Sequence, residues 1–299
     1  MDVLLVDRSE LGKLAVVGPQ AREFLDGQVT NKVDDLAVGS GVYAALLTPK
    51  GKMLGDMRVL RVSESELLLI CERAALQSIF DVIRKALLGW DARLEKRTLE
   101  LGLISLIGDA SAVLGIHAPE PEHASTPFED GFAIATETGV DLVVSAASTP
   151  ALVERLVAAG ATPLADADAE VLRVERGRPR YGIDLDDSVI PQEAGLNERA
   201  VSFTKGCYVG QETVARLYYK GKPNRHLRGL RLSAPIAAGA TLTADEREVG
   251  LITSSVVSPR LGPIALAFVR REVQPGEQVT VAESDGTTAV AEVVELPFS

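Results

Sequence analysis

Hydrophobic positions along the chain change their spacing several times, and each spacing predicts a kind of secondary structure. Short apolar runs that end at turn residues or charges predict strands. These runs lie at residues 14–18, 41–48, 53–62, 67–71, 92–96, 99–107, 132–136 and 140–145. Between Ala74 and Leu88, apolar residues recur every three or four positions, which predicts an amphipathic helix.

Shorter helices complete this part of the chain. They are predicted at residues 20–26, after Asp109, at 150–159 and at 166–177. Thr149 stands where a helix cap is expected, and residues 118–130, rich in Pro, Glu and His, predict a surface loop. Strands and helices mix without a regular βαβ repeat, so the expected fold class is α+β.

From about His226 the pattern changes to short β-rich pieces separated by Gly, Pro and Ser. These pieces lie at residues 227–232, 241–242, 248–255, 264–269, 278–282 and 288–295. Their number and spacing predict a small antiparallel barrel. We therefore expect two domains, which span residues 1–222 and 223–299.

Composition narrows the classes of function. The formal net charge is −11 over 299 residues, which argues against a protein that binds duplex nucleic acid through its overall field. No apolar run approaches the roughly 18 residues of a membrane-spanning helix. Asp7 interrupts the first apolar run, so no signal peptide is expected. Two cysteines favour a reducing cytoplasm, and three scattered histidines predict no metal site.

The stretch at residues 203–213 concentrates chemically active groups. Cys207 is flanked by glycines, which permit a tight loop close to a ligand, and Lys205 precedes it. A helix is expected to open at Tyr208, so that its free amides and the Lys205 ammonium would favour a thiolate. A small buried cysteine in a glycine turn is the ordinary alternative. The other cysteine, Cys71, ends an apolar run and is expected in the core.

The run Lys-Gly-Cys-Tyr-Val-Gly-Gln-Glu at residues 205–212 resembles the signature of the YgfZ family. These proteins are folate-binding relatives of the glycine-cleavage T-protein, an aminomethyltransferase, and are implicated in iron–sulfur cluster assembly and repair. Further similar blocks lie at residues 16–31, 43–52, 173–184, 191–196, 216–217, 250–254 and 258–259. The resemblance implies a GcvT-like folate-binding fold of interwoven α+β subdomains with a C-terminal antiparallel β-barrel.

One departure from the T-protein pattern concerns catalysis. T-proteins carry an Asp-Asp doublet just after the hairpin turn, and one of its carboxylates is catalytic. Here the corresponding pair is Gly55 and Asp56, so only one carboxylate remains. T-proteins also lack the Lys-Gly-Cys-Tyr motif. Both differences favour the YgfZ branch.

The resemblance implies that the cofactor is tetrahydrofolate or another folate derivative. Glu193 matches the family position whose carboxylate accepts the N–H groups along the pterin edge. Glu175 is a weaker contact candidate, and Tyr208 could stack on the pterin or benzoyl ring. Gln211 and Arg216 complete the expected cofactor-binding set.

The folate tail ends in one or more glutamates, whose carboxylates would be bound by cations. Between Thr213 and Ala244 the chain holds six lysines and arginines and no acid. Such segregation in an acidic protein is typical of an anion funnel, or of exposed loop charges near a domain junction. The sequence leaves both interpretations open.

Three functions compete. The main prediction is a tetrahydrofolate-binding accessory protein for iron–sulfur cluster assembly or repair, which supports enzymes such as radical-type tRNA-modifying enzymes. In it, Cys207 and Lys205 would work at the folate cleft, and the partners would be folate and iron–sulfur client or assembly proteins. The alternative is a tetrahydrofolate-dependent aminomethyl or one-carbon transferase with Asp56 as acid/base. A hydrolase with Cys207 as nucleophile is the third, although no base is evident in the sequence.

Overall fold

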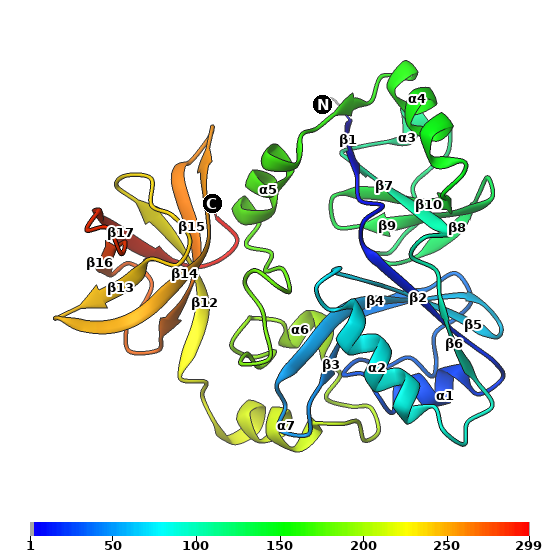
Figure 1. Cartoon of the computed structure of the whole chain (residues 1–299), viewed down its shortest axis with the longest axis horizontal. Helices are drawn as coiled ribbons and strands as arrows, with labels where there is room; N and C mark the ends of the chain where they lie inside the picture. The colour runs from blue at the N-terminus through cyan, green and yellow to red at the C-terminus, as the bar shows by residue number, and fades with distance from the viewer. Residues whose placement is uncertain (1–2, 299) are drawn as a thin grey trace. The chain divides into compact units, whose positions relative to one another are not determined.

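The computed structural model describes residues 3–298 of the chain. These residues form two compact units whose segments interleave along the sequence (Figure 1). Unit 1 comprises residues 3–50, 54–165 and 199–211, and unit 2 comprises residues 51–53, 166–198 and 212–298. Helices and antiparallel sheets mix in the order along the chain. The expected α+β class is confirmed.

Unit 1 contains a five-stranded sheet in the order β3-β4-β5-β2-β6. Its strands are β2 (Gly12–Val17), β3 (Gly41–Leu47), β4 (Met53–Ser63), β5 (Glu66–Cys71) and β6 (Arg93–Lys96). Helix α2 (Leu76–Ala86) buries Ile79 and Ile83, and the short helix α1 spans Ala21–Asp26. At Gly55 of β4, an added Cβ would lie 2.8 Å from atoms of Ala75 and Ile79. The glycine therefore lets α2 approach the sheet closely.

The second sheet of unit 1 has six strands in the order β11-β1-β7-β10-β9-β8. They are β1 (Leu4–Asp7), β7 (Leu101–Ile107), β8 (Ser125–Phe128), β9 (Gly131–Thr136), β10 (Gly139–Ser145) and β11 (Thr162–Pro163). Helices α3 (Ser111–Leu114) and α4 (Thr149–Ala158) belong to this part of unit 1. Neighbouring strands of this sheet are antiparallel, except for the parallel pair β1 and β11.

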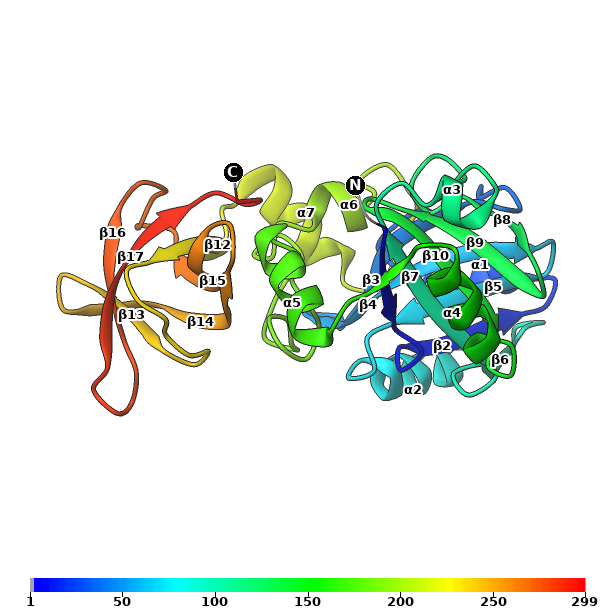
Figure 2. The same cartoon turned by 90° about the horizontal axis from the view of Figure 1, so that it is seen from above.

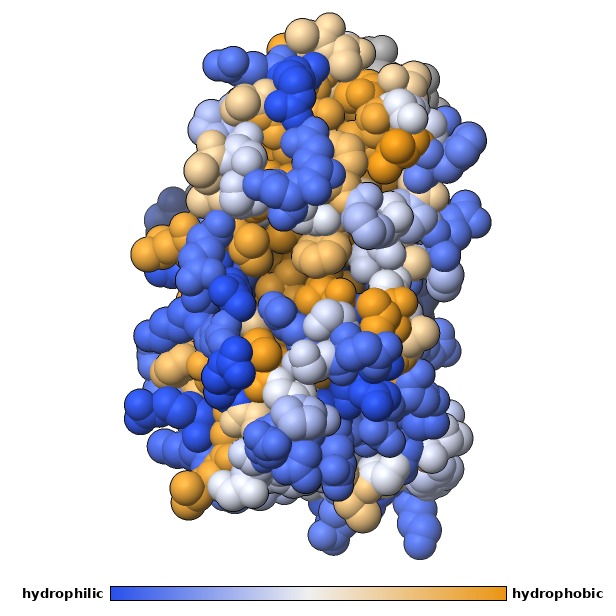
Figure 3. Space-filling view, turned by 90° about the vertical axis from the view of Figure 1, so that its right-hand side faces the viewer, coloured by the Kyte–Doolittle hydropathy of each residue, from blue (hydrophilic) through white to orange (hydrophobic). Residues whose placement is uncertain are grey.

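The two sheets of unit 1 share a hydrophobic core. One cluster joins Leu60 and Leu68 of the first sheet to Leu103, Ile134 and Val143 of the second. Burial of these side chains stabilises the contact between the sheets, because apolar surface is removed from water on both faces. Figure 3 shows apolar side chains gathered in a hollowed band on one face of the molecule, between polar rims.

Unit 2 is built around a closed antiparallel barrel in the order β12-β15-β14-β13-β16-β17 (Figure 2). The strands are β12 (Arg225–Leu232), β13 (Thr241–Ala244), β14 (Arg247–Ser258), β15 (Gly262–Arg270), β16 (Gln278–Ala282) and β17 (Thr288–Val294). Helix α5 (Asp166–Glu175) also belongs to unit 2. The barrel expected from the sequence is confirmed. The domain boundary between residues 222 and 223 stays a prediction.

Two local expectations were wrong. The stretch at 118–130, expected to be a surface loop, contains the strand β8. This strand lies at the edge of its sheet, where Pro127 is tolerated because one side of the strand needs no backbone donor. Thr149 does not cap α4. Its hydroxyl donates to the backbone oxygen of Ser145 at 3.0 Å, and Ser148 occupies the cap position.

The helix of the cysteine-bearing segment also starts later than expected. Helix α7 spans Gln211–Lys220, and the short helix α6 spans Asn197–Ala200. Gly210, immediately before α7, has φ of +86°, a backbone conformation that interrupts a right-handed helix. Tyr208 and Cys207 therefore lie in the loop that leads into α7.

Candidate functional site

A buried carboxylate lies beside a tyrosine on the first sheet of unit 1. Asp56 of β4 is only 6% exposed, and its Oδ2 accepts a hydrogen bond from the hydroxyl of Tyr43 on β3. Its Oδ1 is also buried and has no hydrogen-bond partner among the described residues. A buried carboxylate oxygen without a donor is costly, and such atoms in native proteins often serve a ligand or a reaction.

The surroundings of Asp56 favour its protonated form. Burial raises the pKa of Asp56, and the hydrogen bond from Tyr43 opposes that rise. Burial, together with the neighbouring Asp56 charge, raises the pKa of Tyr43 well above its ordinary value. Tyr43 therefore keeps its proton and remains a donor. A carboxyl group with a raised pKa can exchange a proton near neutral pH, as general acid–base catalysis requires.

Tyr43 is held in place by neighbours within unit 1. The Arg199 guanidinium lies over its ring, 5.5 Å from the centroid, and donates to Glu122 at 2.8 Å. The side-chain amide of Asn31 donates to the backbone oxygens of Tyr43, at 2.9 Å, and of Arg199, at 3.2 Å. The sequence comparison included Tyr43 in a family block but gave it no role, because a hydrogen bond across two strands leaves no local signal.

Gly55 takes the place of a second carboxylate beside Asp56. An added Cβ there would lie 2.8 Å from the Cβ of Ala75 and from the Cδ1 of Ile79, closer than carbon atoms approach in proteins. The space beside β4 is therefore filled by α2. Asp56 is therefore the carboxylate that β4 presents.

Lys205 is buried and acts as a structural cation. Its Nζ donates to the backbone oxygens of Val29 and Asn31, both at 2.9 Å, and to that of Asp26. The carboxylate of Asp26 lies 3.3 Å away. Burial lowers the pKa of Lys205, while Asp26 opposes that change. The ammonium group is thus committed to the segment after α1, which differs from the expectation that it acts on the thiol of Cys207.

The two cysteines differ in environment, as expected for Cys71. Cys71 is buried in β5, and burial raises its pKa to about 12. Cys207 is an exposed free thiol in the loop before α7. Next to it, Tyr208 is buried, and burial raises its pKa to about 12. The Lys205 Nζ lies 5.4 Å from the Tyr208 ring centroid, so this tyrosine packs against the structural cation.

Glu193 lies in unit 2 and is 8% exposed. Its Oε2 accepts from the backbone N–H of Ile190 at 3.2 Å and lies 3.3 Å from the Arg225 guanidinium, which itself sits over the ring of Phe268. The backbone N–H of Leu227 donates to the Glu193 carbonyl at 2.7 Å, which fixes the loop against β12. A fixed, buried carboxylate fits recognition of paired N–H donors. Its pterin role stays a prediction.

The other expected cofactor residues lie in varied settings. The carboxylate of Glu175 accepts from the Ser258 hydroxyl and lies 3.5 Å from Arg260, so it joins α5 to the barrel. Gln211 is half-buried at the start of α7, and Arg216 is exposed on the same helix. Their cofactor roles stay predictions.

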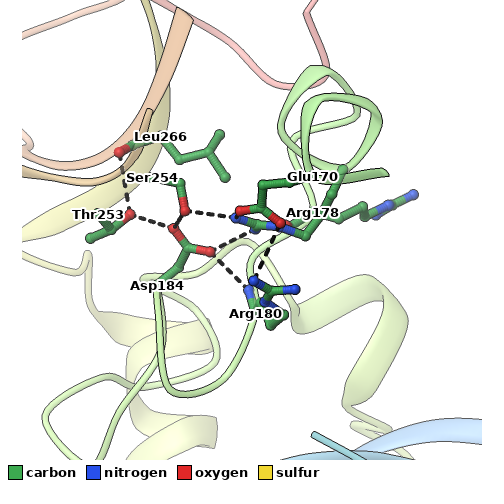
Figure 4. Close-up of polar contacts among 8 residues, drawn as sticks. Glu170, Arg178, Arg180, Asp184, Thr253, Ser254 and Leu266 are labelled. Carbon is green, nitrogen blue, oxygen red and sulfur yellow. Dashed lines mark hydrogen bonds and ion pairs between the residues drawn. The ribbon is translucent and has the colours of Figure 1, made fainter. Parts of the chain in front are cut away.

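The family block at residues 173–184 forms a buried ionic network in unit 2 (Figure 4). Arg173 donates to Asp184 at 2.7 Å, to Ser254 at 2.6 Å and to both oxygens of Glu170. Asp184 also accepts from the hydroxyls of Thr253, at 2.5 Å, and Ser254, at 2.7 Å. Every charge in the set is paired, so the network fixes α5 and the following loop to β14. The sequence similarity here reflects structure.

The basic residues expected to form an anion funnel are partly neutralised. Arg225 lies beside Glu193, and Arg228 lies 2.7 Å from Glu295. Arg180, from the second basic cluster, lies 3.3 Å from Glu170. Glu193 and Glu295 lie outside residues 213–244, so the sequence of that segment does not reveal these pairings.

Within residues 3–298, no helix is long and apolar enough to cross a membrane. In the same range, no group of three or more His, Cys, Asp or Glu side chains could hold a metal ion.

Comparison with known proteins identifies the class. Residues 1–125 match the GCVT N-terminal domain, and residues 225–299 match the glycine cleavage T-protein C-terminal barrel domain. An aminomethyltransferase of Thermotoga petrophila is 30% identical over 98% of this chain and 85% of its own length. The chain therefore belongs to the glycine cleavage T-protein family.

Two other similar proteins cover most of the chain. A chloroplastic protein of Arabidopsis thaliana, named as a putative transferase, is 30% identical over 98% of this chain and 71% of its own length. The crystal structure of the glycine cleavage system aminomethyltransferase T from Bartonella henselae superposes with a TM-score of 0.90. That protein is 27% identical, and the match covers 100% of this chain and 86% of the other.

Proposed function

We propose that the protein is a tetrahydrofolate-dependent transferase of aminomethyl-type one-carbon units. The observation that carries the proposal is the Asp56 carboxyl group, which is buried, bonded to Tyr43 through one oxygen and unpartnered at the other among the described residues. Membership of the T-protein family and likeness to aminomethyltransferases support the same reaction class.

The residues present fit a folate. In unit 1, the unpartnered Oδ1 of Asp56 can accept a hydrogen bond from an amine. In unit 2, the buried carboxylate of Glu193 can accept hydrogen bonds from paired N–H donors such as those of a pterin edge. Arg225 lies 3.3 Å from the same carboxylate and helps to fix its orientation. When bound, tetrahydrofolate would supply the amine that receives the one-carbon unit.

Asp56 would hold and release a proton at Oδ1. Tyr43 fixes the orientation of the carboxyl group through Oδ2, so the other oxygen is the one available for exchange. Burial raises the Asp56 pKa toward the range in which proton transfer at neutral pH is efficient. Because Gly55 offers no second carboxylate, Asp56 would serve both to orient the amine and to move its proton.

A second candidate is the accessory role in iron–sulfur cluster assembly or repair. It is favoured by the exposed free thiol of Cys207 within the Lys-Gly-Cys-Tyr motif, and by the missing second carboxylate at Gly55. In this role the protein would bind folate and present Cys207 to client or assembly proteins, and Asp56 would not be needed for turnover.

Turnover of an aminomethyl donor by the purified full-length chain, with tetrahydrofolate present, tests the proposal. We expect activity that Asp56→Asn lowers by about 10²-fold or more, because a general acid–base contributes about that much. Asp34→Asn, at an exposed aspartate of unit 1, is the matched control and should leave activity unchanged.

Folate binding is measured separately by calorimetry. Wild type that binds tetrahydrofolate without turning over any aminomethyl donor would exclude the transferase. If Cys207→Ser then also failed to restore iron–sulfur enzyme activity in a strain lacking the protein, the accessory role would replace it.

A further inference from the structure

One end of the barrel opens into a cavity of about 570 Å³. On β12, side chains alternate between the two faces, and Leu230 and Leu232 lie in the barrel core. His226 and Arg228 lie four and two positions before Leu230, so their side chains point to the same face of β12 as Leu230 and Leu232. The core residues Val269 and Val273 line the cavity from within. The cavity is therefore the mouth of the barrel, a common place for small ligands.

The charged residues that line this cavity are mostly cations. Lys222, Arg228 and Arg271 contribute positive charge, and Glu272 is the acid among the lining residues. Glu272 lies 4.0 Å from Arg270, and Arg228 lies 2.7 Å from Glu295. Among residues 3–298, neither Lys222 nor Arg271 lies within ion-pair distance of a carboxylate. In a protein of net charge −11, two such cations at one cavity are a local excess.

The cavity rim is built by backbone contacts. The N–H of Arg271 donates to the carbonyl of Asn224 at 2.9 Å, which joins the segment before β12 to the end of β15. This bond places Lys222 and Arg271 on the same rim. Burial and the neighbouring Arg228 lower the pKa of His226, so at neutral pH its ring is uncharged and can donate one N–H.

We propose that the barrel mouth binds a small polyanion with closely spaced phosphate or carboxylate oxygens. Lys222 and Arg271 supply the charge, and Arg228 and His226 add hydrogen-bond donors. Glu193 does not line this cavity, and Arg225, which lies beside Glu193, points to the opposite face of β12 from His226 and Arg228. Anion binding here does not depend on folate chemistry.

Calorimetry on the full chain with pyrophosphate and, separately, citrate tests the proposal. We expect saturable binding of at least one probe, weakened about 10-fold by the double variant Lys222→Gln/Arg271→Gln, because charge-assisted bonds are lost. Arg247→Gln, an exposed arginine at the start of β14, is the control and should bind as wild type does. Both substituted side chains are exposed, and thermal melts check that the variants fold.

The relative affinity for pyrophosphate and citrate identifies the chemical class of the ligand. Tighter binding of pyrophosphate indicates a phosphorylated ligand, and tighter binding of citrate indicates a polycarboxylate. Absence of saturable binding of either probe overturns the proposal. Equal weakening by Arg247→Gln and by the double variant does so as well, since it would reveal attraction to the general surface only.

Discussion

The hydroxyl of Tyr43 donates to Oδ2 of Asp56, and this bond orients a carboxyl group whose pKa is raised by burial. The bond stabilises the ionised form, so it lowers a pKa that burial raises. Two strands therefore determine the chemistry of one side chain. Asp56 is on β4 and its donor is on β3.

Removing the donor should move the pH profile of turnover. Tyr43→Phe removes the side-chain hydrogen bond that opposes the effect of burial, so the Asp56 pKa rises further. The limb of the pH–rate profile that reports Asp56 should shift to higher pH, whether the residue acts as base or as acid. Profiles of kcat for wild type and Tyr43→Phe measure the shift. A limb that stays in place would show that Asp56 does not control the rate.

Restoring a second carboxylate should not restore a T-protein site. In Gly55→Asp, the new Cβ would lie 2.8 Å from Ala75 and Ile79, and a charge would be placed under α2. We expect a loss of about 3 kcal/mol in unfolding free energy and no gain in turnover, because overpacking and buried charge add. Urea unfolding of Gly55→Asp and Gly55→Ala separates the two causes. A stable, more active Gly55→Asp would contradict this account.

Lys205 should contribute to the stability of the fold rather than to the reactivity of Cys207. Lys205→Met removes a cation from three backbone carbonyls and from the carboxylate of Asp26, which keeps its two backbone donors. The free energy of unfolding should fall by about 3 kcal/mol, the cost of breaking a buried pair. Lys32→Met removes an exposed lysine paired with Asp35 and is the control. If Lys205→Met folds as stably as wild type but loses function, the expectation that Lys205 acts with Cys207 is correct.

The sequence predicted most of the fold because its signals are local. The apolar positions of α2 and the six short strands after residue 222 are periodic within each segment, and each formed as expected. The strand β8 was missed because Pro127 and its polar neighbours match a loop, and only an edge position tolerates them. Thr149 was misassigned because a hydroxyl can bond backward to Ser145 as readily as cap a helix.

The site was less predictable because its contacts are long-range. Asp56 was singled out through the resemblance to the T-protein carboxylate doublet, but Tyr43 was not assigned as its donor. Lys205 looked like a neighbour of Cys207, whereas its ammonium binds carbonyls more than 170 positions earlier in the chain. The pairing of Glu193 with Arg225 was hidden for the same reason. No pattern within a segment specifies which distant segment supplies a charge.

Glu193 should contribute to folate affinity. Glu193→Ala should weaken tetrahydrofolate or folinic acid binding by about 2 kcal/mol or more, because a charged acceptor is removed from a buried site. Isothermal calorimetry on the two proteins measures the difference. Glu198→Ala, at an exposed glutamate on α6, is the control and should bind as wild type does. Equal affinities for wild type and Glu193→Ala would remove Glu193 from the site.

Cys207 should be the reactive thiol of this chain. It is exposed, whereas Cys71 is buried and its pKa is raised to about 12, so a maleimide at neutral pH should label Cys207 far faster. Mass spectrometry of labelled wild type, Cys207→Ser and Cys71→Ser assigns the modified residue. Bound folate should slow the labelling if the thiol lines the folate cleft.

The same variant decides between the two proposed functions. In a strain lacking the protein, the accessory role requires that Cys207→Ser fail to restore iron–sulfur enzyme activity although folate binding survives. The transferase role requires that Cys207→Ser restore function and that Asp56→Asn fail, because the proton is then moved by the carboxyl group beside Tyr43. The two outcomes exclude each other, since each assigns the essential chemistry to a different side chain of unit 1.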